Sequence, residues 1–567
     1  MDDVDAVQAQ IARHMLQSGD WVTARLDGVP YLEKSPLIYW TMAVSYRLLG
    51  VHDWAARLPL ALTVVVLCWV IVRFGIWAFG AEAGLYSGLV LSTCVGLFLF
   101  TRVLIPDAAL TLCVTVAIWS FLRALEPGEP RARLWATLLA ASLGAGLLLK
   151  GLIALVFPTG AALAYMAITR QLFSRETWRR LHPFSGLLIM TLVAAPWHVL
   201  AMLRNPPLFD FTMHSGPGEY RGFFWFYFIN EHVLRFLNLR YPRDYNTVPR
   251  LWFWLLHFVW LFPWSFYIPA ALRLNYKPVD RAGRVRLLAL CWIGWVMLFF
   301  SFSTTQEYYS MPIYPAIALL LGSAMTTGSA WVQRGTAALG AASALALAVI
   351  AAVLWKVRGM PAPGDISAAL AHHPELYTFS LGHMGDLTLR SFAYLRLPLA
   401  VAGVAALVGT AGILRYRKNG RRGFAAAAVM MVIIFHAARL AMIPFDPYLG
   451  SKPLAEALIS APPGKLIEAD AYYTFSSVFF YTNRRALLWN GRVNNLEYGS
   501  YAPGAAQVFI GDADLQRFWR SSERYYLLAR DGDLPHVREL VGQSSVHVVR
   551  ESGEKCLITN LEILPKR

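Results

Sequence analysis

Charged residues are scarce in this sequence, since Asp, Glu, Lys and Arg make up only 15% of its 567 residues. Soluble globular domains carry about 25% charged residues, so the composition excludes an ordinary soluble protein. Hydrophobic residues make up 57% of the chain, and only lipid can cover an apolar surface of that extent. We therefore predict an integral membrane protein that crosses the bilayer many times.

Cysteine is also rare, with five residues in the whole chain. Four of them lie in apolar runs, and only Cys556 lies in a polar stretch. The polar C-terminal segment therefore has no partner for an internal disulfide, and the lack of any CxxC spacing excludes a thiolate metal site.

Acidic residues are in deficit, since the sequence has 35 aspartates and glutamates but 51 lysines and arginines. In a soluble protein this excess would suggest nucleic acid as a partner. In a membrane protein it fits basic residues retained in cytoplasmic loops. We therefore predict membrane lipids, and no nucleic acid, as partners.

Twelve apolar runs approach the length of about 20 residues that a membrane-spanning helix needs. They cover residues 58–79, 83–101, 108–124, 134–149, 152–169, 184–203, 249–272, 286–303, 311–326, 336–356, 393–414 and 423–443.

Three loops between these runs are rich in arginine and lysine, namely 170–183, 273–286 and 415–422. Counting the runs puts all three loops on one side, which the positive-inside rule assigns to the cytoplasm. Residues 1–57 then lie outside, although they lack the basic flank and apolar core of a signal peptide. We expect a further span to precede Met1 and to carry them across.

The predicted fold class is an all-α polytopic membrane protein with a small α/β domain at its C-terminus. We expect an outer acidic loop with juxtamembrane helices in 1–57, a membrane domain in 58–443 and an outer domain in 444–567. In the last, strand-like runs alternate with helical patches such as 454–459. The strand-like runs are 472–481, 506–510, 525–528 and 546–549.

Polar residues gather at the outer ends of the predicted spans, which points to a site at the outer interface. Each group has an ordinary explanation. Aspartates often cap helices, and tyrosines form interfacial belts. A glutamate and a histidine can pair with each other instead of binding a cation. Together they supply cations for a phosphate, including Arg235, and carboxylates for proton transfer. The groups contain Asp2, Asp3, Asp5; Tyr31, Glu33, Lys34; Arg102, Asp107; Glu231, His232, Arg235, Arg240; and Glu307, Tyr308, Tyr309.

The same residues carry a resemblance to a known family. The segment that contains SGDWVTARLDGVPYLEK resembles the first outer loop of C-type glycosyltransferases of the protein O-mannosyltransferase clan, which are similar to glycosyltransferase family 39. It is especially similar to the bacterial branch that contains the lipid A 4-amino-4-deoxy-L-arabinose transferase. The segments FINEHVLRF and TTQEYYSMPIYP resemble later parts of the same branch.

The resemblance implies a polyprenyl-phosphate sugar as donor and a lipid, glycan or protein as acceptor, at the periplasmic face of a bacterial inner membrane. It implies catalytic acids at Asp107 and among Asp2, Asp3 and Asp5. It also implies that Lys34 binds the donor phosphate, with Tyr31 and Tyr309 nearby. Glu33 and His232 are candidates for a bound divalent metal.

We therefore predict a membrane glycosyltransferase that uses a polyprenyl-phosphate sugar. The alternative is a multi-pass transporter or a flippase of lipid-linked sugars. Transporters place polar residues and broken helices near the midplane and often contain internal repeats. The sequence contains no obvious repeat and no charge pair in the middle of a predicted span.

Overall fold

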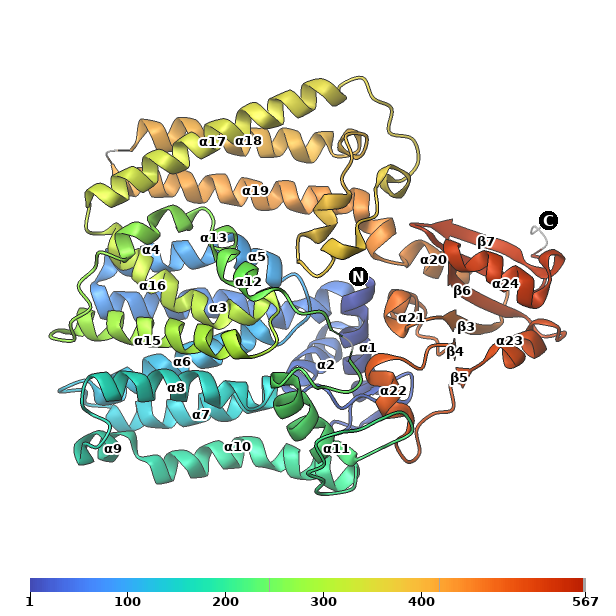
Figure 1. Cartoon of the computed structure of the whole chain (residues 1–567), viewed down its shortest axis with the longest axis horizontal. Coiled ribbons are helices and arrows are strands. Elements are labelled where there is room, and N and C mark those ends of the chain that lie inside the picture. Colours follow the sequence, from blue (N-terminus) through green and yellow to red (C-terminus); the bar gives the residue numbers. More distant parts are fainter. Residues whose placement is uncertain (244, 418, 564–567) are drawn as a thin grey trace.

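Long apolar helices run side by side through most of the computed structural model, which describes residues 1–243, 245–417 and 419–563 (Figure 1). Within these ranges, eight helical segments are long and apolar enough to cross a membrane. They are α3 (Asp53–Phe79), α6 (Asp107–Leu125), α7 (Ala132–Lys150), α9 with α10 (Arg175–Leu181 and Pro183–Arg204), α15 (Arg281–Phe302), α17 (Ala330–Val357), α18 (Arg396–Arg415) and α19 (Gly420–Leu449).

Three of the predicted spans consist of more than one helical segment. Run 83–101 forms α4 (Ala81–Ser92) and α5 (Val95–Phe100), and run 311–326 forms η3 (Glu307–Ile313) and α16 (Tyr314–Met325). Run 249–272 bends by 96° between α13 and η2. It contains α12 (Arg250–Leu255), α13 (His257–Trp260), η2 (Trp264–Tyr267) and α14 (Ile268–Ala271).

A backbone hydrogen bond joins two of these breaks. Pro263 has no N–H to donate at the bend. The amide of Val95, which follows the break after α4, donates to the carbonyl of Phe262 at 3.1 Å. A freed backbone group at one break is thus satisfied at the other, as an apolar interior requires. The helix α8 (Ile153–Ile168) is continuous but short, and the predicted count of twelve spans stays a prediction.

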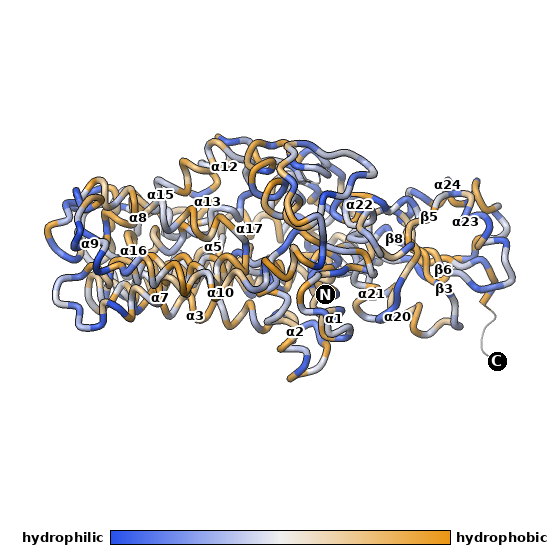
Figure 2. The backbone as a smooth tube through the Cα atoms, turned by 90° about the horizontal axis from the view of Figure 1, so that it is seen from below, coloured by the Kyte–Doolittle hydropathy of each residue, from blue (hydrophilic) through white to orange (hydrophobic). Residues whose placement is uncertain are grey.

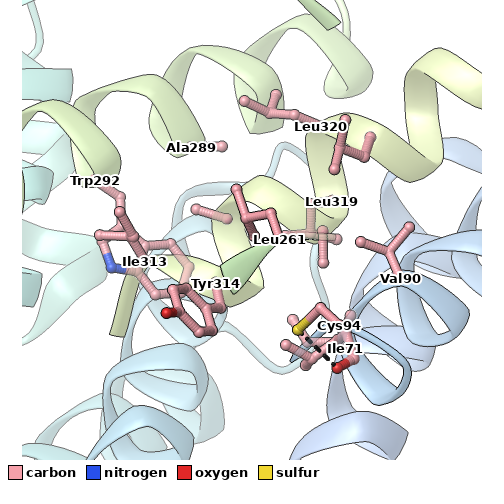
Figure 3. Close-up of a cluster of buried hydrophobic side chains, with 14 of the residues drawn as sticks. Ile71, Val90, Cys94, Leu261, Ala289, Trp292, Ile313, Tyr314, Leu319 and Leu320 are labelled. Carbon is pink, nitrogen blue, oxygen red and sulfur yellow. Dashed lines mark hydrogen bonds between the residues drawn. The ribbon is translucent and has the colours of Figure 1, made fainter. Parts of the chain in front are cut away.

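The apolar core of the membrane domain lies where these helices meet. Figure 3 shows Ile71 of α3, Val90 of α4, Trp292 of α15 and Leu319 of α16 gathered around Leu261, all of them almost fully buried. The hydrophobic colouring of Figure 2 follows the helices of this domain and gives way to hydrophilic segments around α9 at one end.

The three basic loops all lie at that same end, and the C-terminal sheet lies at the opposite end (Figure 1). Glu126 links two of the loops, because it pairs with Arg281 and Arg284 at 2.9 Å each while its carbonyl accepts from Arg180 at 3.0 Å. The prediction that these loops share one side is therefore confirmed.

Two N-terminal helices, α1 (Asp3–Ser18) and α2 (Leu37–Leu49), pack between the membrane domain and the C-terminal sheet. The hairpin of β1 (Arg25–Leu26) and β2 (Val29–Pro30) connects them. Asp2 caps α1 by accepting from the amide of Asp5 at 2.9 Å, which is the ordinary explanation for an aspartate at this position. Side chains of α1 and α2 share one buried core with the C-terminal residues, so the two ends of the chain are packed together.

The C-terminal region folds around a six-stranded sheet in the order β5-β4-β3-β6-β8-β7. The first four strands are parallel, and β7 and β8 add an antiparallel edge. The strands are β3 (Lys465–Ala469), β4 (Leu487–Trp489), β5 (Phe509–Ile510), β6 (Tyr525–Arg530), β7 (His547–Ser552) and β8 (Lys555–Thr559). The helices are α20 (Lys452–Ser460), α21 (Ser476–Thr482), α22 (Asn494–Ser500), α23 (Asp512–Trp519) and α24 (Leu534–Val541).

The small α/β fold of this region is confirmed, but one predicted strand is wrong. Residues 472–481 form η8 (Tyr472–Thr474) and α21, even though aromatic residues of this kind favour strands. Most of these side chains are buried against α1 and α20, and this packing outweighs the local preference.

Candidate active site

A cavity of about 410 Å³ opens between the juxtamembrane segments and the ends of the membrane helices that lie away from the basic loops. Its walls come from the segment before α2, the ends of α6, α7, α8 and α15, η1 (Trp225–Leu234) and η3. Most of the lining is apolar. Its polar groups are Glu33, Lys34, Ser35, Asp107, Lys150, Tyr227, Glu231, His232, Arg235, Ser303, Thr304, Tyr308 and Tyr309.

Glu33 has several hydrogen-bond and ion-pair partners. It pairs with Lys34, accepts from the hydroxyl of Tyr31 at 2.9 Å, and accepts from the amide nitrogen of Asn495 at 2.6 Å. Burial by itself would raise the pKa of Glu33, but Lys34, Arg240 and Arg235 hold it below its usual value. Glu33 therefore stays ionised and keeps these cations in place.

Arg235 is held from two sides. It donates to the carboxylate of Glu231 at 2.7 Å and to the hydroxyl of Tyr309 at 2.9 Å. A second guanidinium, that of Arg240, pairs with the same Glu231 and donates to Asn495 at 2.5 Å. Asn495 lies in α22, so the C-terminal region fixes two charged groups of the site. This asparagine was not among the predicted site residues, because it lies far from the predicted spans along the chain.

Asp107 begins α6 and pairs with Lys150 at the end of α7, at 2.5 Å. The ammonium of Lys150 also lies 5.4 and 4.7 Å from the ring centres of Tyr308 and Tyr309. Lys150 was not among the predicted site residues. Its signal in the sequence is a lysine directly after the apolar run 134–149, at the end predicted to lie outside.

His232 lines the cavity, but both of its ring nitrogens have backbone partners. Nδ1 lies 2.5 Å from the carbonyl of Tyr227, and Nε2 accepts from the amide of Leu152 at 3.0 Å. Glu33 faces cations, and no group of three or more metal-ligating side chains occurs among the residues with a described position. The proposed pair of Glu33 and His232 therefore does not fit a metal site.

The three N-terminal aspartates do not line this cavity. Asp3 points to the C-terminal region, where it binds the ammonium of Lys555 at 2.6 Å and accepts from the amide of Ser477 at 2.8 Å. Asp5 pairs with Arg57 and accepts from the amide of Leu104 at 2.7 Å, in the loop that leads to Asp107. Of these acids, Asp5 is thus the one that contacts a cavity wall segment.

Asp5 gives the stability of the protein a pH dependence. Burial and the charge of Asp2 raise its pKa from 3.8 to about 7, so the folded state binds its proton more tightly than the unfolded state. This contribution to stability is present below about pH 4 and is lost as the pH rises to about 7. Relative to an Asp5→Asn variant, the wild type should lose about 1.4 kcal/mol per pH unit across this window. Thermal unfolding of both proteins at several pH values measures the difference, and a constant difference would contradict the prediction.

Together, the fold and the site define a polytopic membrane protein with an apolar cavity that ends in cations and carboxylates at one end of the helices. Residues 33–199 match the family model described as dolichyl-phosphate-mannose-protein mannosyltransferase. An undecaprenyl phosphate-alpha-4-amino-4-deoxy-L-arabinose arabinosyl transferase of Edwardsiella ictaluri (strain 93-146) is 25% identical over 548 residues, which are 93% of this chain and 89% of that one. The protein of the same name from Erwinia tasmaniensis is 26% identical over 94% of this chain and 88% of its own length.

The crystal structure of ArnT from Cupriavidus metallidurans bound to undecaprenyl phosphate has the same fold, with a TM-score of 0.77. The two chains are 22% identical, and the match covers 98% of this chain and 93% of the other. These findings confirm the predicted resemblance: the chain is a membrane glycosyltransferase that is similar to the bacterial aminoarabinose transferases over most of its length, and its residues 33–199 are similar to the protein mannosyltransferases.

Proposed function

We propose that the chain transfers a sugar from undecaprenyl phosphate to an acceptor at the periplasmic face of the bacterial inner membrane. The main observation in support of this proposal is the shape and charge of the cavity. Its apolar walls suit a prenyl chain, and Lys34, Lys150 and Arg235 stand at the polar part, where a phosphate would lie. The printed names of the relatives favour 4-amino-4-deoxy-L-arabinose as the sugar and a lipid A phosphate as the acceptor.

The proposed topology follows from the basic loops. With 170–183, 273–286 and 415–422 in the cytoplasm, residues 1–57 and 444–567 lie on the periplasmic side, and residues 58–443 form the membrane domain with twelve spans. The short helix α8 and the broken segments complete the count beyond the eight long helices. The cavity then opens at the outer leaflet, where a lipid-linked sugar and an envelope lipid meet.

The proposed reaction is a displacement at the anomeric carbon. The acceptor oxygen forms a bond to this carbon while the bond to the donor phosphate oxygen breaks, and polyprenyl phosphate leaves with the electron pair. Lys34, Arg235 and the hydroxyl of Tyr309 stabilise the charge on the departing phosphate. Tyr31 acts through Glu33, which it orients by its hydrogen bond.

A second cavity of about 310 Å³ supports a place for the sugar. It shares Glu33, Lys34, Arg235 and Tyr308 with the first cavity, but polar groups dominate its remaining walls. These come from Tyr245, Asn246, Gln306, Tyr377 and Thr378. A sugar attached to a phosphate beside Lys34 and Arg235 would reach these hydrogen-bonding groups, while the prenyl chain stays in the apolar cavity.

We assign the role of orienting the acceptor to Asp107. Asp5 is the N-terminal acid that supports Asp107. Asp107 lies in the cavity wall, and its charge is held by Lys150. A carboxylate at this position can orient an acceptor hydroxyl or phosphate and take its proton where one must leave. Asp5 acts through the amide of Leu104 at the start of the same loop. Asp2 accepts from the amide of Asp5 and Asp3 pairs with Lys555, so we assign to both acids a role in stabilising the fold.

The assignment predicts that Asp107→Asn lowers turnover about 10²-fold, because the carboxylate positions the acceptor and a misplacement of about 1 Å can cost that much. Purified protein, undecaprenyl-phosphate aminoarabinose and lipid A would be incubated together, and the products measured by mass spectrometry. Asp531→Asn is the control, since this acid is exposed and lies outside both cavities.

Two results would overturn the proposed function. One is the absence of any new glycosidic bond with the wild-type protein and these substrates or with total envelope lipids. The other is movement of the donor across sealed vesicles without transfer, which would establish the flippase alternative. Mass spectrometry of envelope lipids from a deletion strain identifies the acceptor.

A further inference from the structure

A separate cavity of about 140 Å³ lies where the second half of α1, the tip of the β1–β2 hairpin and the segment after α21 meet. It shares no lining residue with either cavity of the candidate active site. Its defining feature is positive charge: Arg13, Arg25, Arg484 and Arg485 all line it. The single carboxyl group in its wall is that of Asp27.

The four guanidinium groups are not neutralised by the protein. Within the described parts of the chain, none of them lies within 4.0 Å of a carboxylate oxygen in an ion pair. Arg13 donates to the carbonyl of Phe480 at 2.8 Å, and Arg25 to that of Gly28 at 3.1 Å. Nε of Arg13 and Nη1 of Arg484 are buried and have no acceptor among the described residues.

Arg13, Arg25 and Arg484 are partly buried, whereas Arg485 is exposed at the rim of the cavity. Because guanidinium groups stay protonated at every physiological pH, partial burial without a counter-ion is costly. Asp27 offsets little of this charge, because burial raises its pKa to about 7 despite the nearby Arg485. The effect of the cluster extends to His14, whose pKa is lowered by burial and by Arg485 and Arg25. The electrostatics of the cavity therefore favour an anion.

We propose that this arginine pocket binds a phosphate group, either as the free ion or as the phosphomonoester of a lipid. Guanidinium groups bind phosphate through paired N–H donors, and groups from three segments can contact several oxygens of one tetrahedral ion. Two buried N–H groups already lack an acceptor, and phosphate oxygens supply it.

Bound phosphate would bridge arginines of the N-terminal segment and of the C-terminal region. Arg13 and Arg25 come from the N-terminal segment, whereas Arg484 and Arg485 come from the C-terminal region. The hairpin that carries Arg25 ends at Pro30, directly before the Tyr31–Lys34 segment of the active site. Occupancy of the pocket would therefore hold that segment against the C-terminal region.

The test is a titration of purified full-length protein in detergent with inorganic phosphate, followed by thermal unfolding. A Lys34→Ala background weakens phosphate binding at the active site, and the part of the remaining rise in melting temperature that depends on Arg485 reports on the arginine pocket. In this background, Arg485→Gln should weaken the apparent affinity about tenfold or more, equivalent to about 1.4 kcal/mol. Arg517→Gln, which removes an exposed guanidinium of the same region, should leave it unchanged.

The source of the phosphate is distinguished in nanodiscs of zwitterionic lipid with and without phosphatidic acid. Stabilisation by phosphatidic acid that Arg485→Gln abolishes identifies a lipid phosphate, whereas stabilisation by inorganic phosphate alone identifies the free ion. No phosphate-dependent shift in the Lys34→Ala background, or an equal shift in Arg485→Gln and Arg517→Gln, would overturn the proposal. Arg25→Gln on the hairpin serves as the second variant should Arg485→Gln fail to fold.

Discussion

Replacing Lys34 by alanine is expected to lower sugar transfer about 10²–10³-fold, the usual cost of removing a group that stabilises developing negative charge. Lys34 lies between the two cavities of the active site, next to Glu33 and within the polar wall shared with Arg235. No other described lysine lines both cavities. The departing phosphate would lose one of its cations, while the acceptor side of the site stays unchanged.

The fold should survive this substitution, because Glu33 keeps Arg235, Tyr31 and Asn495 as partners. The effect is measured as single-turnover transfer with purified protein at saturating acceptor. Lys452→Ala is the matched control, since this half-exposed lysine of α20 lies outside every described cavity wall of the site. Unchanged turnover in Lys34→Ala would show that the donor phosphate binds elsewhere.

Replacing Asp3 by alanine should destabilise the folded protein by about 3–5 kcal/mol, as expected when one partner of a buried ion pair is removed. Asp3 and Lys555 are 6% and 13% exposed, so the ammonium would be left with little water. The amide of Ser477 and the hydroxyl of Ser451 would also lose their acceptor. Thermal unfolding in detergent measures the loss as a lower melting temperature.

Two further variants separate the structural role of Asp3 from a catalytic one. The double variant Asp3→Ala/Lys555→Met should recover part of the lost stability, because it removes the unpaired charge. Asp3→Asn keeps an oxygen for the amide of Ser477, so the protein should fold and retain its transfer activity. A folded but inactive Asp3→Asn protein would instead make Asp3 the catalytic acid.

The membrane domain could be predicted from the sequence because apolar run length is a strong physical signal. All twelve predicted runs fall on helical segments, and the basic loops were correctly grouped at one end. Pro263 is a signal for the bend after Phe262, but the break at Thr93 has no proline and its pairing with Phe262 joins two distant segments, which a single sequence does not reveal. The helix at 476–482 was missed for a similar reason, since its packing and not its composition decides its structure.

The candidate site could be predicted in part. Lys34, Asp107, Arg235 and Tyr309 were expected to converge because all four lie in or next to segments predicted to be on the same side of the membrane, and the structure brings them into one cavity wall. The N-terminal aspartates share that side but turn toward Arg57 and Lys555 instead. Sidedness follows from charge counting, whereas the direction of a side chain depends on tertiary contacts that a single sequence does not reveal.

Asn495 has a consequence for how the protein is made. Its amide nitrogen binds Glu33 and its amide oxygen binds Arg240, so the cations of the site gain their final positions only when this residue is in place. During synthesis the membrane helices emerge from the ribosome long before residue 495. We therefore expect the nascent chain to insert before the polar groups of the site have all their partners.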